Sequence, residues 1–166
     1  MKKLNSYFGM AENDYLYAKS GLEICRKLGN FNHVASGCSQ AAEKYLKALA
    51  ERCLVGDPDG VLIMKTHNLR TLVNKVKQYY PEIPLNSKDC KWLGDFYFDA
   101  RYPGDNFVEV NEEDALECLK ITEEIRTAVL AALDENDEII CDLLSNKTVS
   151  EAENREKAKL KGMKKL

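Results

Sequence analysis

The sequence predicts an all-α protein, an antiparallel bundle of helices, on three observations. Over 166 residues there are only four prolines and nine glycines, and they cluster in a few short stretches that leave long helix-permissive segments between them. Within those segments apolar residues recur at steps of three and four. No segment shows sustained period-two alternation, so a β-sheet is not expected. Consecutive helices joined by short turns pack antiparallel, which predicts the bundle.

The first predicted helix ends at Gly29, and its apolar residues at positions 11 to 25 alternate steps of four and three. Glycine supplies the left-handed conformation that ends such a helix. The second helix covers about residues 33–53 and has one broad apolar side. Its opposite side is a polar ribbon that we expect to be solvated, consisting of Gln40, Glu43, Lys44, Lys47 and Glu51.

A third helix is predicted at about residues 68–80, with Thr66 as its N-cap and Pro81 as its end. The loop before it includes residues 57–60, which begin like a calcium-binding loop. The later ligands and the closing glutamate of such a loop are missing, so a plain turn is expected there.

The fourth helix is capped by Asn86 or Ser87 and ends where Pro103 forbids continuation. The fifth begins at Asn111, whose side chain can cap it, and the three acidic residues that follow lie at the positive end of the helix dipole. The predicted buried stripe of the fifth helix is Ala115, Cys118, Leu119, Ile125, Val129 and Leu133.

Composition fits one helical domain, residues 1–145, followed by a basic tail, residues 146–166, that we expect to be partly disordered or frayed. No run approaches the ~18 apolar residues of a membrane helix, and the start is too polar for a signal peptide, so we expect a cytoplasmic protein without membrane contact. The six cysteines lie far apart and no histidine stands at metal-ligand spacing. We therefore expect neither metal nor cofactor, and thiols that pack as small apolar groups.

Three patches stand out by residue type. They are Gln40-Ala41-Ala42-Glu43-Lys44-Tyr45-Leu46-Lys47-Ala48, Thr66-His67-Asn68-Leu69 and Asp99-Ala100-Arg101-Tyr102-Pro103-Gly104-Asp105. In this order and spacing they resemble the HEPN domain, a helical module named for its occurrence in higher eukaryotes and prokaryotes as a nucleotide-binding unit. The resemblance runs from the Ala11-x-x-Asp14-x-x-x-Ala18 pattern to about Leu133. It implies an up-and-down bundle of four longer helices with an additional short helix.

The resemblance also implies partners. HEPN domains are often dimeric, and they frequently stand beside a minimal nucleotidyltransferase, fused or encoded next door as a toxin–antitoxin pair. The chain is also similar to the helical C-terminal domain of kanamycin nucleotidyltransferase. The fourth helix favours a homodimer independently, because it has more aromatic residues than its own core needs: Trp92, Phe96, Tyr97 and Phe98.

Many HEPN proteins are metal-independent ribonucleases that use an arginine followed, after four to six residues, by a histidine. The imidazole moves a proton and the guanidinium stabilises charge on the phosphate. After Arg101 the permitted positions hold Asn106, Phe107 and Val108, none of which transfers a proton. The sequence therefore favours a non-catalytic domain. Arg26 and His33 have the permitted separation but span the turn between two helices, and they remain the alternative pair for a ribonuclease toxin.

Arg101 is the first candidate for binding a nucleotide or RNA phosphate. Tyr97 lies four residues earlier on the same helix face, so a ring and a guanidinium could accept a base and a phosphate together. His67 and Tyr102 are the further candidate ligand-binding residues, with Lys44 and Lys47 as outer support. The alternative is a purely structural dimeric interaction module, in which Arg101 pairs with a neighbouring aspartate and the lysines are solvated.

Overall fold

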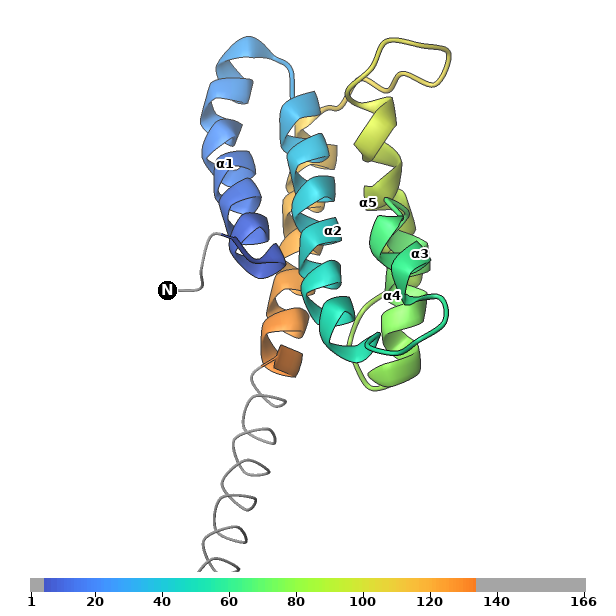
Figure 1. Ribbon diagram of the computed structural model, residues 1–166. Coiled ribbons are helices and arrows are strands. Elements are labelled where there is room, and N and C mark those ends of the chain that lie inside the picture. Colours follow the sequence, from blue (N-terminus) through green and yellow to red (C-terminus); the bar gives the residue numbers. More distant parts are fainter. Residues whose placement is uncertain (1–4, 134–166) are drawn as a thin grey trace, which may run out of the picture. The chain divides into compact units, whose positions relative to one another are not determined.

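The computed structural model describes residues 5–133, and Figure 1 shows their arrangement. The chain divides after Ala132 into two units, and the fold below is that of the first, within which residues 5–132 are described. These residues are helical without strands. The helices are α1 (Tyr7–Leu28), α2 (Asn32–Cys53), α3 (Gly60–Lys65), α4 (Leu69–Tyr79), α5 (Ser87–Asp99) and a last one over residues 112–132, unlabelled and orange in Figure 1. The predicted all-α bundle is confirmed.

Helix α2 is the centre of the bundle. It packs against α1 on one side and against α4 and α5 on the other, and α4 also packs against α5. The 112–132 helix is joined to both α1 and α2, because Arg126 binds the carboxylate of Glu12 and the Thr122 hydroxyl donates to the Cys38 carbonyl. Small residues bring α1 and α2 close together: a Cβ added at Gly37 would lie 3.2 Å from the Cβ of Ala18.

Helix ends follow the sequence signals in most places. Gly29 has φ 67° and ends α1 in the left-handed conformation, as predicted. Asn86 caps α5 by accepting a hydrogen bond from the Lys88 amide, and Asn111 caps the last helix by accepting one from the Asp114 amide at 2.8 Å. Asn111 was the predicted cap of its helix, and Asn86 was one of two predicted candidates, the other being Ser87.

Two local predictions were wrong. Residues 60–65 form the short helix α3, although the sequence pattern predicted no helix between residues 53 and 68 and the resemblance implied an additional short helix without placing it. Its apolar side chains are largely exposed, so they give no periodic stripe by which a helix is recognised. Thr66 does not cap α4. Asn68 does, accepting from the Thr71 amide at 2.9 Å, while the Thr66 hydroxyl accepts from the Asn68 amide.

A polar group at the end of the core, formed by Glu12, Tyr45 and Arg126, joins α1, α2 and the 112–132 helix. The Tyr45 hydroxyl donates to Glu12 at 2.7 Å, and the same carboxylate receives Arg126 Nε at 2.6 Å. Burial, followed by the contact with Glu12, raises the pKa of the Tyr45 hydroxyl above its ordinary value. The hydroxyl therefore stays protonated and acts as a donor, which ties α2 to α1.

Cysteines 25, 38, 90 and 118 are buried, in line with their prediction as small apolar residues, whereas Cys53 is only partly buried and Cys141 lies outside the described residues. Burial raises the pKa of Cys38 and of Cys90 to about 12. Among the described residues no helix is long and apolar enough to cross a membrane, and no group of three or more metal-ligating side chains is close enough to hold an ion. The predicted domain end at residue 145 and the basic tail 146–166 lie outside the described residues.

Candidate functional site

Arg101 follows Ala100, the C-cap residue of α5, and so lies just beyond the end of the helix that positions Tyr97. Its guanidinium carbon lies 5.3 Å from the centroid of the Tyr97 ring and 5.4 Å from that of Tyr102, within the range of cation–π contact. Arg101 is exposed and, within residues 5–133, forms no ion pair. The alternative pairing with Asp99 or Asp105 is therefore not observed. The guanidinium is held by two rings and keeps its five donors for another acceptor.

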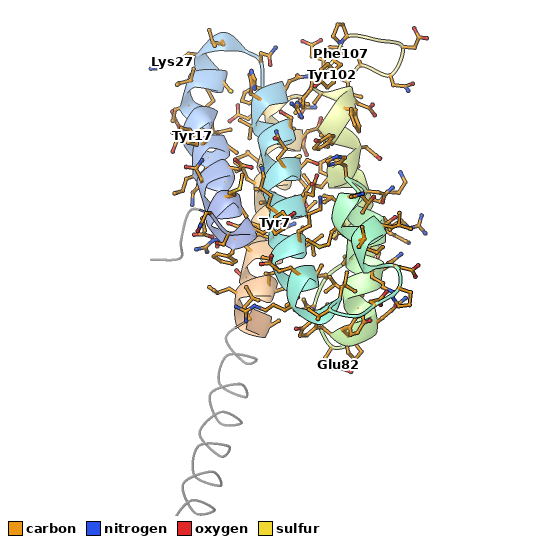
Figure 2. The ribbon with its side chains drawn as sticks, in the orientation of Figure 1. Tyr7, Tyr17, Lys27, Glu82, Tyr102 and Phe107 are labelled. Carbon is orange, nitrogen blue, oxygen red and sulfur yellow. The ribbon has the colours of Figure 1, made fainter. Side chains whose placement is uncertain are left out.

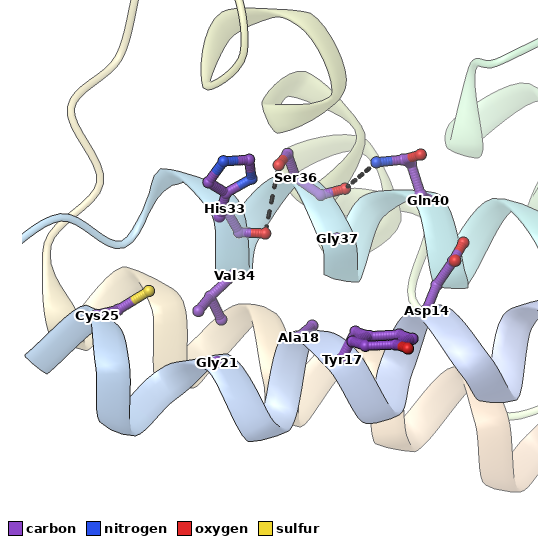
Figure 3. A pocket seen from close by; sticks show the side chains of 10 residues that line it. All are labelled: Asp14, Tyr17, Ala18, Gly21, Cys25, His33, Val34, Ser36, Gly37 and Gln40. Carbon is purple, nitrogen blue, oxygen red and sulfur yellow. Dashed lines mark hydrogen bonds between the residues drawn. The ribbon is translucent and has the colours of Figure 1, made fainter.

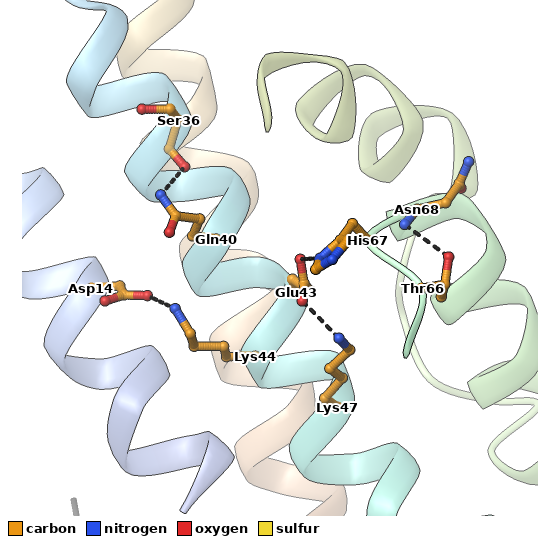
Figure 4. A network of polar contacts seen from close by, with 9 residues as sticks. All are labelled: Asp14, Ser36, Gln40, Glu43, Lys44, Lys47, Thr66, His67 and Asn68. Carbon is orange, nitrogen blue, oxygen red and sulfur yellow. Dashed lines mark hydrogen bonds and ion pairs between the residues drawn. The ribbon is translucent and has the colours of Figure 1, made fainter. Parts of the chain in front are cut away.

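His67 reaches the same ring from the segment between α3 and α4. Its imidazole stacks on Tyr97 with centroids 4.9 Å apart and planes 20° apart. Its Nδ1 lies 3.0 Å from Oε2 of Glu43, as Figure 4 shows. The ring is half exposed, and Nε2 has no hydrogen-bond partner among the described residues. We call His67, Tyr97, Arg101 and Tyr102 the Arg101 cluster.

The carboxylate of Glu43 is itself bound by the buried ammonium group of Lys47. The Lys47 ammonium lies 2.7 Å from Oε1 of Glu43, and the two residues are only 5% and 8% exposed. The prediction of a solvated ribbon was wrong for both, because α3, α4 and the segment between them cover this side of α2. One carboxylate thus accepts from Lys47 with one oxygen and contacts His67 with the other, which fixes the imidazole against Tyr97.

Lys44 and Lys47, the two lysines expected to support the ligand site from outside, do not lie as predicted. Lys44 pairs with Asp14 and so faces α1, away from the Arg101 cluster (Figure 4). Lys47 reaches the cluster only through Glu43. Within this part of the structure the exposed positive charge of the cluster comes from Arg101.

The loop that carries Arg101 is fastened to α2 by one buried amide. Asn32 Nδ2 donates to the carbonyl oxygens of Ala100 at 3.0 Å and Val108 at 2.7 Å, and its Oδ1 accepts from the Val110 amide at 3.0 Å. These bonds close the loop after α5 at both ends. Sequence reasoning missed Asn32, since an asparagine at a helix start reads as an ordinary cap.

Exposed aromatic rings extend the cluster along the end of α5. Phe98 meets Tyr97 edge-on with centroids 4.7 Å apart and lies 6.4 Å from Tyr102. Tyr102 and Phe107 both belong to the loop that follows α5, and Figure 2 labels them. Phe98, Tyr102 and Phe107 are each about half exposed. Flat apolar faces next to a guanidinium suit a planar ring that carries a negative group.

Each of the three sequence patches contributes to this one place: Glu43 comes from the first, His67 from the second and Arg101 from the third. The chain matches the family model of the HEPN domain over residues 5–135. The protein belongs to the HEPN family. Comparison with curated proteins and with solved structures finds no significant match. In this HEPN domain, segments remote in sequence thus meet at the end of α5.

The second pair considered from the sequence, Arg26 and His33, makes no mutual contact within the described part of this HEPN domain. Arg26, on α1, binds Glu23, and its Nε lies 2.7 Å from Oε1 of Glu112. His33 stands at the start of α2 and lines a groove between α1 and α2 with Ser36 and other residues (Figure 3). Arg26 does not line that groove. Its guanidinium is occupied by two carboxylates, which leaves it less free to receive a phosphate.

Proposed function

We propose that this HEPN domain is a binding module for the phosphate of a nucleotide or of RNA, with the Arg101 cluster as its ligand surface. The observation that supports it most directly is an exposed guanidinium that is held over two rings and makes no ion pair in the described part of the chain. A structural arginine would be expected to find a carboxylate, and two aspartates stand near it in the sequence.

The chemistry of the surface fits such a ligand. A guanidinium binds two phosphate oxygens with parallel N–H groups, and this planar geometry is the reason that arginine and lysine differ at phosphate sites. Exposed rings of Phe98 and Tyr102 offer faces on which a base can stack, a contact that tolerates every base. We therefore expect binding that depends on the phosphate and discriminates little between bases.

Arg101→Ala is the variant that tests this proposal. Binding of ATP and of a short single-stranded RNA is measured by titration calorimetry at moderate salt. We expect the variant to bind at least about tenfold more weakly, and Arg101→Lys to be intermediate because it keeps charge without the planar fork. Arg70→Ala, which removes an exposed arginine of α4, is the matched control. Equal affinity of Arg101→Ala and wild type would refute the proposal.

A second function, metal-independent RNA cleavage, is supported by one observation. None of the residues that follow Arg101 at the permitted spacing transfers a proton, but a histidine from another part of the chain contacts the same aromatic ring as Arg101. His67 lies against the same Tyr97 ring, oriented at Nδ1 by Glu43 and with Nε2 unoccupied. In such a reaction Nε2 takes the proton of a ribose 2′-hydroxyl, whose oxygen attacks the adjacent phosphorus. The P–O5′ bond breaks, and the products are a 2′,3′-cyclic phosphate and a 5′-hydroxyl end, whose oxygen takes its proton from water.

The two functions are separated by incubating the protein with single-stranded RNA in the presence of EDTA. A binding module leaves the RNA intact. A ribonuclease, acting as a toxin, releases cyclic-phosphate ends, and His67→Ala and Arg101→Ala each abolish the cleavage. Cleavage that is lost instead in Arg26→Ala and His33→Ala would favour the pair first considered from the sequence.

A minimal nucleotidyltransferase as partner also remains a proposal, supported by membership of the HEPN family. Co-expression with a nucleotidyltransferase encoded beside this gene, followed by size-exclusion chromatography, tests it. Elution of the two chains in one peak is the expected result, and separate elution at all concentrations would contradict it.

A further inference from the structure

The outer face of α1 is unusually apolar for an exposed helix surface. Met10, Tyr17, Ile24 and Leu28 lie on it and are between 46 and 74% exposed. Figure 2 shows Tyr17 on the outer side of α1, on a different helix from the Arg101 cluster. This face therefore has no part in the proposed ligand surface.

These residues are spaced like the contact seam of a coiled coil. With Asp14 and Gly21 included, the positions advance from 10 to 28 in alternating steps of four and three, so all six share one stripe of α1. The one charged member, Asp14, is paired with Lys44 of α2. The stripe thus presents apolar side chains and a gap at Gly21, without an unpaired charge.

A groove runs along the same stripe. It has a volume of about 270 Å³ and lies between α1 and α2, with Ala18, Gly21 and Gly37 among its lining residues (Figure 3). The space around Gly21 differs from the space around Gly37. A Cβ at Gly37 would press on Ala18, whereas a Cβ at Gly21 would meet nothing within 4 Å. Gly21 therefore leaves open space at the surface, which a side chain from outside can fill.

The stripe fits the same stripe of a second α1 helix that runs antiparallel to it. If two α1 helices cross antiparallel with the two-fold axis midway between Tyr17 and Gly21, the large ring of each lies opposite the gap of the other. The same operation sets Met10 opposite Leu28 and Asp14 opposite Ile24, where the carboxylate stays paired with Lys44 of its own chain. A two-fold interface requires this kind of self-complementary surface. Of the flanking residues Asn13, Ser20 and Lys27, only Lys27 is charged, and its counterpart in this pairing is Asn13.

We propose that a second copy of this chain docks on α1, antiparallel, with Tyr17 of each copy in the groove beside Gly21 of the other. The self-complementary order of the stripe selects a second copy over an unrelated partner. This interface differs from the one expected from the aromatic residues of α5, and it leaves those residues to the ligand surface. It does not depend on the proposed function.

Sedimentation equilibrium of the full chain tests the proposal. Wild type is expected to be dimeric, and Tyr17→Lys combined with Ile24→Lys is expected to weaken the dimer at least about tenfold. Leu16→Lys is the matched control, since Leu16 is exposed on α1 but lies about a third of a turn from the centre of the stripe. It should leave the dimer unchanged.

Gly21→Leu provides a sharper test of the geometry. It adds apolar surface and improves helix propensity, so a non-specific hydrophobic contact would become stronger. In the proposed dimer it fills the space that receives Tyr17, and we expect it to weaken association. The proposal fails if wild type is monomeric at the highest attainable concentration, if Gly21→Leu strengthens the dimer, or if Phe98→Lys dissociates it while the Tyr17 and Ile24 changes do not.

Discussion

The imidazole of His67 lies face to face with the ring of Tyr97, with centroids 4.9 Å apart and planes inclined by 20°. The first residue precedes α4 and the second belongs to α5, so this stack joins two segments at the candidate site. Oε2 of Glu43, on α2, lies 3.0 Å from Nδ1 of the imidazole. Three parts of the chain therefore determine where Nε2 points.

Replacing Glu43 by glutamine should destabilise the fold as well as release His67. The change leaves the ammonium of Lys47, which is only 5% exposed, without its carboxylate. Loss of one partner of a buried ion pair costs about 3 kcal/mol of unfolding free energy. Urea denaturation measures the loss. The double variant Glu43→Gln with Lys47→Met should recover much of it, and an equally unstable double variant would show that the pair itself is not the cause.

Replacing Asn32 by alanine should loosen the loop that carries Arg101. The Ala100 and Val108 carbonyls lose their donor and the Val110 amide loses its acceptor, which costs about 2 kcal/mol. Hydrogen exchange at the Val110 amide should become much faster. Asn30→Ala is the control, because it removes only the bond to the Asn32 amide and should leave exchange at Val110 unchanged. Equal exchange in both variants would contradict this role of Asn32.

The sequence was sufficient for the helices with long apolar stripes and for the ends marked by Gly29, Asn86 and Asn111. Those signals are local, since a stripe or a cap acts within a few residues. The position of the short helix α3 was missed because two of its apolar side chains, Val61 and Leu62, are exposed and the segment forms no stripe.

The members of the Arg101 cluster were named from the sequence, but a contact between them was predictable only where they are close along the chain. Tyr97 and Arg101 are one helical turn apart, and the structure places the guanidinium over the ring. The stack of His67 on Tyr97 and the burial of Lys47 depend on how α4 and α5 pack on α2 and on each other. Such a relationship is tertiary, and no spacing along the chain indicates it.

Acid should weaken the contacts that join Asp57, in the loop before α3, to Tyr79 and Lys75 of α4. A hydrogen bond from Tyr79, followed by that from Lys75, lowers the pKa of Asp57 from 3.8 to about 2. Because the folded-state pKa lies below the unfolded one, the stabilisation is complete above 3.8 and is lost as the pH falls towards 2. In urea titrations wild type should therefore lose more stability across this range than Asp57→Asn. Parallel losses in the two proteins would contradict the assignment.

Alanine substitutions at two glycines of neighbouring helices should have different effects on stability. Gly21→Ala in α1 adds a Cβ to open space and removes the conformational freedom of glycine, so it should stabilise the protein by about 0.5–1 kcal/mol. Gly37→Ala in α2 brings the same gain in propensity, but its Cβ meets that of Ala18 at 3.2 Å and the two helices must separate slightly. We expect Gly37→Ala to be clearly less stable than Gly21→Ala in thermal and urea unfolding. Equal stabilisation by both would show that α1 and α2 are not in tight contact at Gly37.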